Sequence, residues 1–79
     1  ITMDEKRLRQ FRELGLTISY YRRLKGLTQT QLADLVGLSR THISNIEAPK
    51  VRTSLSLDSL FDIADALDVQ VKELFNFRG

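Results

Sequence analysis

Hydrophobic residues recur at every third or fourth position along most of this chain, with polar residues between them. This spacing places the hydrophobic side chains on one face of a helix, so the pattern predicts a series of amphipathic helices. The expected helices cover residues 4–25, 29–36, 40–48, 56–67 and 70–75. Such helices bury their hydrophobic faces against one another, and the sequence therefore predicts an all-α fold.

The second expected helix has the clearest pattern. Leu32, Leu35 and Val36 fall at three- and four-residue spacing, which puts them on one face. Thr28 is a good N-cap, because its hydroxyl can accept a hydrogen bond from the first turn. Gly37 follows at once and suits the left-handed residue that ends many helices. These signals predict where the helix begins and where it ends.

The third expected helix follows after only a short connection. Ser39 can cap it, and Ile43 and Ile46 form its hydrophobic face. Its other side carries five side chains that can donate hydrogen bonds: Arg40, Thr41, His42, Ser44 and Asn45. Two short helices joined by a tight, glycine-containing turn form a helix-turn-helix, whose second helix enters the major groove of DNA. The sequence therefore predicts a DNA recognition helix at residues 40–48.

The first expected helix is longer than the others and contains a glycine. Gly15 costs about 1 kcal/mol relative to alanine inside a helix, so we expect a break there between a short leading helix and the first helix of the main domain. The leading part carries three arginines that can reach DNA phosphates or simply keep this surface solvated: Arg7, Arg9 and Arg12. Ile1 and Thr2 precede Met3, and we interpret them as a tag remnant.

Composition narrows the classes of function. Seventy-nine residues allow one small domain. The absence of cysteine excludes disulfides and thiolate metal sites and fits a reducing, cytoplasmic location. With a single histidine, no metal site and no cofactor are predicted. No hydrophobic run approaches the roughly 20 residues of a membrane span, and no signal-peptide pattern is present.

Charge is distributed unevenly along the chain. Residues 1–25 hold seven Lys/Arg and three Asp/Glu, a balance of +4, and residues 26–54 have a balance of +1. Residues 55–79 hold two Lys/Arg and five Asp/Glu, a balance of −3. One end of the molecule can therefore meet phosphates while the acidic end faces away or meets a partner. Charge alone favours the simpler interpretation, which is that these are solvated helix faces.

Several motifs together point to a family. They are Leu27-Thr28-Gln29, Gln31-Leu32-Ala33, Val36-Gly37-Leu38-Ser39, Ile43-Ser44 and Ile46-Glu47, followed by Leu60, Ile63-Ala64, Ala66-Leu67, Val69 and Glu73-Leu74-Phe75. Over residues 14–75 the chain resembles the lambda-repressor-like helix-turn-helix family, the Cro/phage-repressor or Xre type. The resemblance implies a compact five-helix domain at residues 14–77, with residues 1–13 as an N-terminal helical extension. It also implies a transcriptional regulator, a repressor, that binds a double-stranded DNA operator sequence-specifically as a homodimer.

The side chains of the recognition helix suit base reading. Arginine can donate two hydrogen bonds to guanine, asparagine can pair with adenine, and threonine can contact the thymine methyl group. We therefore expect base contacts from Arg40, Thr41, Ser44 and Asn45. DNA backbone contacts are expected from Thr28, Gln29, Ser39, His42, Lys50 and Arg52. Gln29 is the main anchor, because it lies in the first turn of a helix and matches the family's phosphate-binding position.

The resemblance also implies contacts within and between copies of the protein. Arg22 matches a family arginine that pairs with the glutamate ending the recognition helix, here Glu47. That ion pair is structural and fixes the angle between the first and third helices. Three hydrophobic residues at the C-terminal end are candidates for the homodimer contact: Val71, Phe75 and Phe77. The alternative is that they pack back onto the first helix.

Three residues depart from the family pattern. Pro49 follows the recognition helix where glycine is common, and proline cannot adopt positive φ, so the path of residues 50–54 is expected to differ. Asp68 also replaces a common glycine, although aspartate tolerates left-handed geometry moderately. Gln70 is a poor N-cap where the family prefers serine or threonine.

Two other classes of function remain to be weighed. Antitoxins of this family bind both DNA and a protein, so a protein-interaction module on the same fold is the alternative, and a large exposed hydrophobic patch would mark it. An enzyme is not expected, because the only histidine lies on an exposed helix and the acidic residues are spread out. Asp58, Asp62 and Asp65 recur at helical spacing, and we expect them to form a solvated acidic stripe rather than a cation site.

Overall fold

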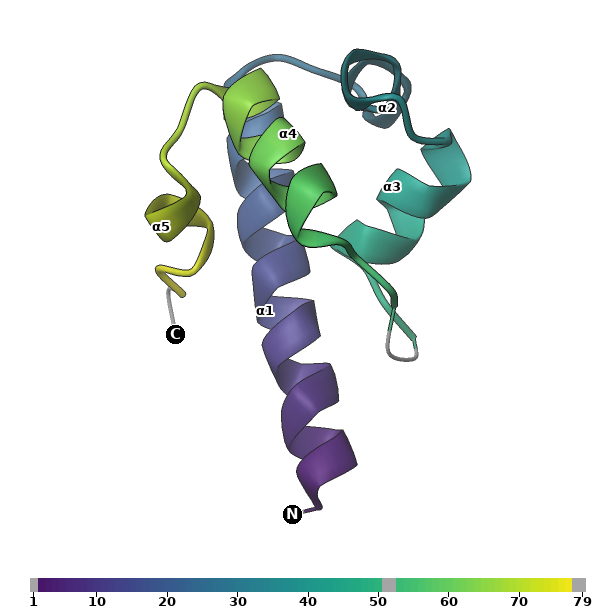
Figure 1. The fold of residues 1–79 in the computed structure, drawn as a ribbon, viewed down its shortest axis with the longest axis vertical. Coiled ribbons are helices and arrows are strands. Elements are labelled where there is room, and N and C mark those ends of the chain that lie inside the picture. The colour runs from purple at the N-terminus through teal and green to yellow at the C-terminus, as the bar shows by residue number, and fades with distance from the viewer. Residues whose placement is uncertain (1, 51–52, 78–79) are drawn as a thin grey trace.

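The computed structural model describes residues 2–50 and 53–77, and these residues form five helices (Figure 1). The helices are α1 (Met3–Leu24), α2 (Gln29–Val36), α3 (Arg40–Glu47), α4 (Leu57–Leu67) and α5 (Val71–Leu74). No strand occurs in this described part of the chain. The all-α, five-helix fold is therefore confirmed, and each helix begins and ends within one residue of its predicted bound.

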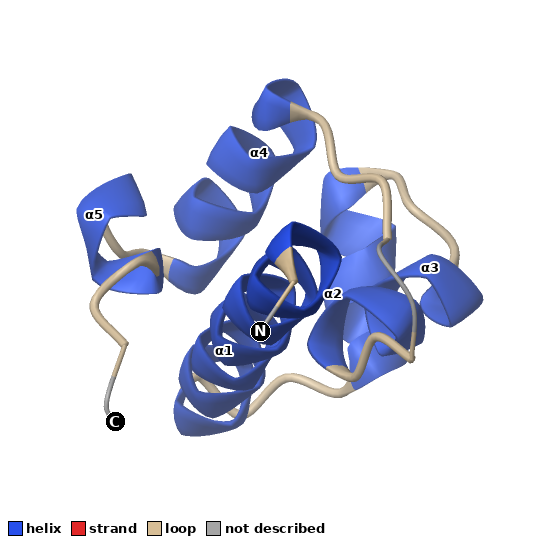
Figure 2. Cartoon of the chain, turned by 90° about the horizontal axis from the view of Figure 1, so that it is seen from below, coloured by secondary structure: helices blue, strands red, loops and turns tan. Residues whose placement is uncertain are grey.

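Every helix contributes a large, fully buried side chain to a single core. The largest of these are Ile18, Leu32, Ile43, Ile63 and Leu74, one from each helix in chain order. Seen from below, α2 and α3 lie to one side of α1, while α4 lies above it and α5 lies to the other side (Figure 2). Because all five helices supply the core, no helix can bury its hydrophobic face without the others.

α1 is one continuous helix, so the predicted break at Gly15 is wrong. Gly15 is buried where α1 crosses the C-terminal end of α3. A Cβ atom at this position would lie 2.7 Å from the carbonyl oxygen of Glu47 and closer still to that of Ile46. The glycine is therefore required by the close approach of two helices, and it does not end either of them.

Leu35 was expected on the buried face of α2 but is 62% exposed. α2 packs against α3 and α4, and it does so with the side that carries Leu32 and Ala33, both buried. Val36 is half-buried on the same side. Leu35 lies on the other flank of the hydrophobic stripe, where none of the described helices covers it. The predictions for Ile43 and Ile46 are confirmed, because both are buried.

The predicted ends of the two short helices are confirmed. The Thr28 hydroxyl accepts a hydrogen bond from the backbone N–H of Gln31 at 3.1 Å, and the Gln31 side chain accepts one from the backbone N–H of Thr28 at 2.8 Å. This reciprocal pair is a capping box. Gly37 has φ +70°, the left-handed conformation that ends α2. Ser39 accepts from the backbone N–H of His42 at 3.0 Å and so caps α3.

Asp68 ends α4 in the left-handed conformation, with φ 57°. Asp68→Gly is expected to raise the free energy of unfolding by about 0.5 kcal/mol, because glycine adopts this conformation without a Cβ penalty. The Lys25–Asp68 pair that is lost spans 3.9 Å in solvent and contributes little. Thermal unfolding would show the gain as a rise in Tm of about 2–4 °C. A lower Tm would mean that the aspartate side chain stabilises this turn.

The start of α5 agrees with its prediction. Gln70 makes no side-chain capping hydrogen bond, and α5 is only four residues long. Tyr21 is half-buried against the core, whereas Tyr20 is exposed. Among the described residues, no helix is both long and apolar enough to cross a membrane.

Candidate nucleic-acid interface

α3 has two sides with different environments. Ile43, Ile46 and Glu47 are buried and hold the helix against the core. Between them the helix turns Arg40, Thr41 and Asn45 into solvent, as a helix of 3.6 residues per turn requires. These three of the four predicted base-reading residues therefore lie together on an exposed surface. The fourth, Ser44, is half-buried.

His42 has a partner inside the protein. Its Nε2 atom lies 3.1 Å from the carbonyl oxygen of Ser54, and the residue is half-buried. In the tautomer that carries its proton on Nε2, the ring donates to this carbonyl. The imidazole thus joins α3 to the segment that follows it. A phosphate contact from His42 stays a prediction.

Gln29 belongs to a buried polar group that its position in the sequence did not indicate. Its side-chain Nε2 donates to Glu47 Oε1 at 3.1 Å. The other oxygen of Glu47, Oε2, accepts from Arg22 Nε at 2.6 Å, while Arg22 Nη2 also donates to Oε1 at 3.0 Å. Glu47 therefore orients the glutamine amide and leaves that amide's second N–H and its carbonyl oxygen for an external partner.

The Arg22–Glu47 pair joins α1 to α3 as expected. The Arg22 side chain is only 8% exposed and the Glu47 side chain only 5%, and the guanidinium binds the carboxylate in a bidentate manner. Arg22 Nη1 also donates to the Leu27 carbonyl at 2.7 Å, at the loop that leads into α2. One arginine thus ties together α1, the start of α2 and the end of α3.

The chain leaves α3 through Ala48 and Pro49. Ala48 has φ −141° and ψ 67°, outside the helical region, and Pro49 is buried. Arg12 of α1 donates from Nε to the Pro49 carbonyl at 3.3 Å and so holds this exit. Lys50 is exposed beside it. The prediction for Arg52 lies outside the described residues.

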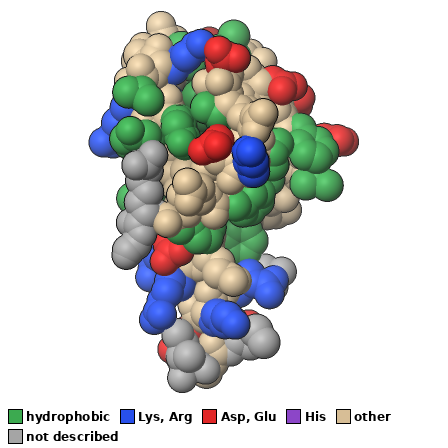
Figure 3. Space-filling view, turned by 90° about the vertical axis from the view of Figure 1, so that its left-hand side faces the viewer, with side chains coloured by type: hydrophobic (Ala, Val, Ile, Leu, Met, Phe, Trp, Pro, Cys, Tyr) green, Lys and Arg blue, Asp and Glu red, His purple; other side chains and the backbone are tan. Residues whose placement is uncertain are grey.

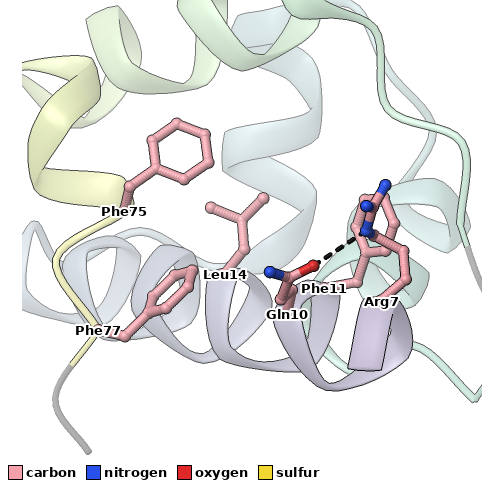
Figure 4. A pocket seen from close by; sticks show the side chains of 6 residues that line it. All are labelled: Arg7, Gln10, Phe11, Leu14, Phe75 and Phe77. Atoms are coloured by element: carbon pink, nitrogen blue, oxygen red, sulfur yellow. Dashed lines mark hydrogen bonds between the residues drawn. The ribbon is translucent and has the colours of Figure 1, made fainter. Parts of the chain in front are cut away.

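The three C-terminal candidates do not behave alike. Val71 and Phe77 are half-buried and pack against the core, which agrees with the alternative that they fold back onto α1. Phe75 is 50% exposed. Figure 4 shows Phe75 and Phe77 on one side of a cavity of about 280 Å³, with Leu14 and Phe11 from α1 on its other side. The dimer role of this end stays a prediction.

The described residues contain no group of three or more His, Cys, Asp or Glu side chains that could hold a metal ion. Asp58, Asp62 and Asp65 are all exposed on α4, as expected of a solvated stripe. The exposed side of α3 offers hydrogen-bond donors to a ligand, from Arg40, Thr41 and Asn45.

The fold and this surface define a helix-turn-helix protein, and comparisons with known proteins agree. The sequence model of the helix-turn-helix family matches residues 18–74. The control protein C.SmaI of Serratia marcescens is 33% identical over 66 residues, which span 84% of this chain and 76% of that protein. The chain belongs to this helix-turn-helix family, of the lambda-repressor-like type, and the resemblance is confirmed.

Solved structures carry the same fold. The restriction-modification controller protein C.AhdI from Aeromonas hydrophila superposes with a TM-score of 0.75 at 35% identity, covering 82% of this chain and 96% of that one. SinR, a master regulator for biofilm formation solved in complex with DNA, gives a TM-score of 0.71 at 32% identity, covering 80% of this chain and 98% of that one. A further structure shows SinR with the protein SinI.

Proposed function

We propose that this protein is a transcriptional regulator that binds double-stranded DNA sequence-specifically and represses its target. The observation that carries the proposal is the division of α3, which buries Ile43, Ile46 and Glu47 and exposes Arg40, Thr41 and Asn45. That arrangement lets the helix enter a major groove while it stays fixed to the core. The family's transcriptional regulators, DNA-bound SinR among them, support the same function.

The contacts with DNA divide into two kinds. Arg40, Thr41, Ser44 and Asn45 read base edges. Thr28, Gln29, Ser39, His42, Lys50 and Arg52 hold the phosphate backbone. Gln29 is the best supported of the second group, because Glu47 fixes its amide at the N-terminus of α2, where backbone N–H groups attract an anion. The DNA-binding domain is assigned to residues 14–77, and residues 1–13 extend its first helix.

The protein acts as a homodimer on a site with two-fold symmetry. Two recognition helices then enter successive major grooves, about 34 Å apart. Phe75 supports a contact at the C-terminal end, because half of its surface is exposed beside a hydrophobic cavity. If about six phosphates are neutralised, affinity falls by roughly 10³ between 50 and 200 mM salt. The regulator acts in the cytoplasm, with no cofactor and no catalytic step.

A protein partner at the same C-terminal end is the second candidate function. The observation that favours it is again the exposed ring of Phe75, and SinR offers a parallel because it forms a complex with SinI. In this case the protein partner would bind a variant that lacks Arg40 and Gln29 with the same affinity as it binds the wild type.

Selection from random duplex DNA tests the proposed function. The wild-type protein should enrich a two-fold symmetric motif, and Arg40→Ala/Thr41→Ala should lose that motif, because each lost base contact costs about 1–3 kcal/mol of discrimination. Lys72→Ala is the matched control, since it removes one positive charge from an exposed residue outside α3. Binding that is weak, free of any motif and equally salt-sensitive in all three proteins would contradict the proposal.

A further inference from the structure

The outer face of α1 carries a stripe of large hydrophobic side chains. Leu16, Tyr20 and Leu24 follow one another at intervals of four residues, so they lie in a row on one side of the helix. They are 67%, 44% and 69% exposed. Single exposed leucines are ordinary on a protein surface, but a contiguous row of three marks a contact site.

Positive charge borders this stripe. Arg9 and Arg23 are exposed and lie seven residues before and after Leu16, which places both on the same face of α1. Glu5 is exposed and Glu13 half-buried, one turn to either side of Arg9, so the N-terminal end of this face carries both signs of charge. Arg23 is therefore the cation that marks the C-terminal end of the stripe.

The outer face of α4 has the same form with the opposite charge. Leu57 and Phe61, one helical turn apart, are 63% and 44% exposed. The exposed carboxylates Asp58, Asp62 and Asp65 lie within about one turn of Phe61. The acidic stripe thus borders the exposed hydrophobic pair Leu57 and Phe61. Exposed hydrophobic side chains do not help to solvate a surface, so we consider this face as a contact site.

These two faces belong to different helices of one core. α1 and α4 pack on that core with Ile18 and Ile63, so the exposed side of each helix is turned away from the core that the two helices share with their neighbours (Figure 2). In Figure 3, acidic side chains border hydrophobic ones near the upper right edge, and Lys and Arg side chains gather around the lower stalk, with others at the upper left edge, at the top and near the centre. Because both rows are exposed in the single chain, neither covers the other, and a contact between them joins different copies of the chain.

We propose that the outer face of α1 in one copy binds the outer face of α4 in a second copy. Each face carries exposed hydrophobic side chains one helical turn apart, and Arg23 beside the α1 stripe is opposite in charge to the aspartates beside Leu57 and Phe61. Since the two surfaces differ, the contact is head-to-tail and can be repeated. This contact is separate from the proposed C-terminal dimer contact. It joins neighbouring molecules and goes beyond the proposed DNA-binding function.

Sedimentation of the full chain without DNA tests this contact. The weight-average mass of the wild type should rise with concentration past that of a dimer, and this rise should shrink at high salt because exposed charges are screened. Arg23→Glu and Asp62→Lys should each weaken the association about tenfold, because each places like charges opposite one another. An equimolar mixture of these two variants should recover the wild-type association, since the reversed face of each meets the reversed face of the other.

A matched variant makes the test specific. Asp34→Lys makes the same charge reversal as Asp62→Lys at an exposed position of α2, away from both faces and from the proposed C-terminal dimer contact, and it should leave the association unchanged. Circular dichroism should show that every variant is folded. A wild-type mass that stops at the dimer, a control that weakens the association as much as the face variants do, or a mixture that fails to recover would each overturn the contact. None of these outcomes affects the DNA-selection result, because α3 carries neither face.

Discussion

Gly15→Ala is expected to destabilise the domain by about 3 kcal/mol, although alanine is the better helix former. Inside a helix the substitution alone would gain about 1 kcal/mol. Here the new methyl group would collide with the carbonyl oxygens of Ile46 and Glu47. Both are backbone atoms and cannot rotate away, so α3 must move from α1, and overpacking of this kind costs about 1–3 kcal/mol or more.

The loss should be visible in two measurements. Urea unfolding should give a lower midpoint with an unchanged slope, and DNA affinity should fall because the shifted helix is the recognition helix. Gly26→Ala is the control. Gly26 has φ +78°, and a Cβ added there would meet no neighbouring atom within 4 Å, so only backbone strain of about 1 kcal/mol is expected. Equal losses in the two variants would mean that the α1–α3 crossing tolerates a side chain.

Glu47→Ala is expected to cost about 3–5 kcal/mol, which is a large share of the stability of a domain of this size. The substitution leaves the Arg22 guanidinium buried without its carboxylate. It also releases the Gln29 amide, which Glu47 holds at the start of α2. Breaking a buried pair from one side is costly because the remaining charge is neither solvated nor paired.

A double-mutant cycle separates the pair from the packing. Arg22→Met/Glu47→Leu replaces both charges by hydrophobic side chains, and we expect it to recover at least half of the stability that Glu47→Ala loses. Chemical denaturation of Arg22→Met, Glu47→Leu and the double variant measures this coupling. If the two single losses simply add in the double variant, then the ion pair is not what joins α1 to α3.

Local signals in the sequence were sufficient for most of the fold. Thr28, Ser39 and Gly37 act on residues within one turn of themselves, so the ends of α2 and α3 could be predicted from the residues alone. The same holds for Ile43 and Ile46, whose spacing fixes the inner side of α3. These features depend on the helix that contains them and on little else.

The errors and the contacts that were not predicted both involve distant parts of the chain. Gly15 is required because the backbone of α3 passes close to it, and the spacing of residues within α1 could not reveal that contact. Leu35 does belong to the predicted hydrophobic stripe of α2. Its exposure depends on which flank of that stripe meets α3 and α4. The hydrogen bond from Arg12 to Pro49 joins residues 37 apart, and no motif in the sequence indicates it.

The two-sided character of α3 has a consequence for how this protein can change. The residues that hold the helix in place and the exposed residues proposed to read DNA are different residues. Substitutions at exposed positions such as Thr41 and Asn45 usually alter stability by no more than about 0.5 kcal/mol. New operator preferences can therefore arise by drift or by design at these positions without compensating changes in the core. The same scaffold can diverge into paralogues that recognise different DNA sites while folding alike.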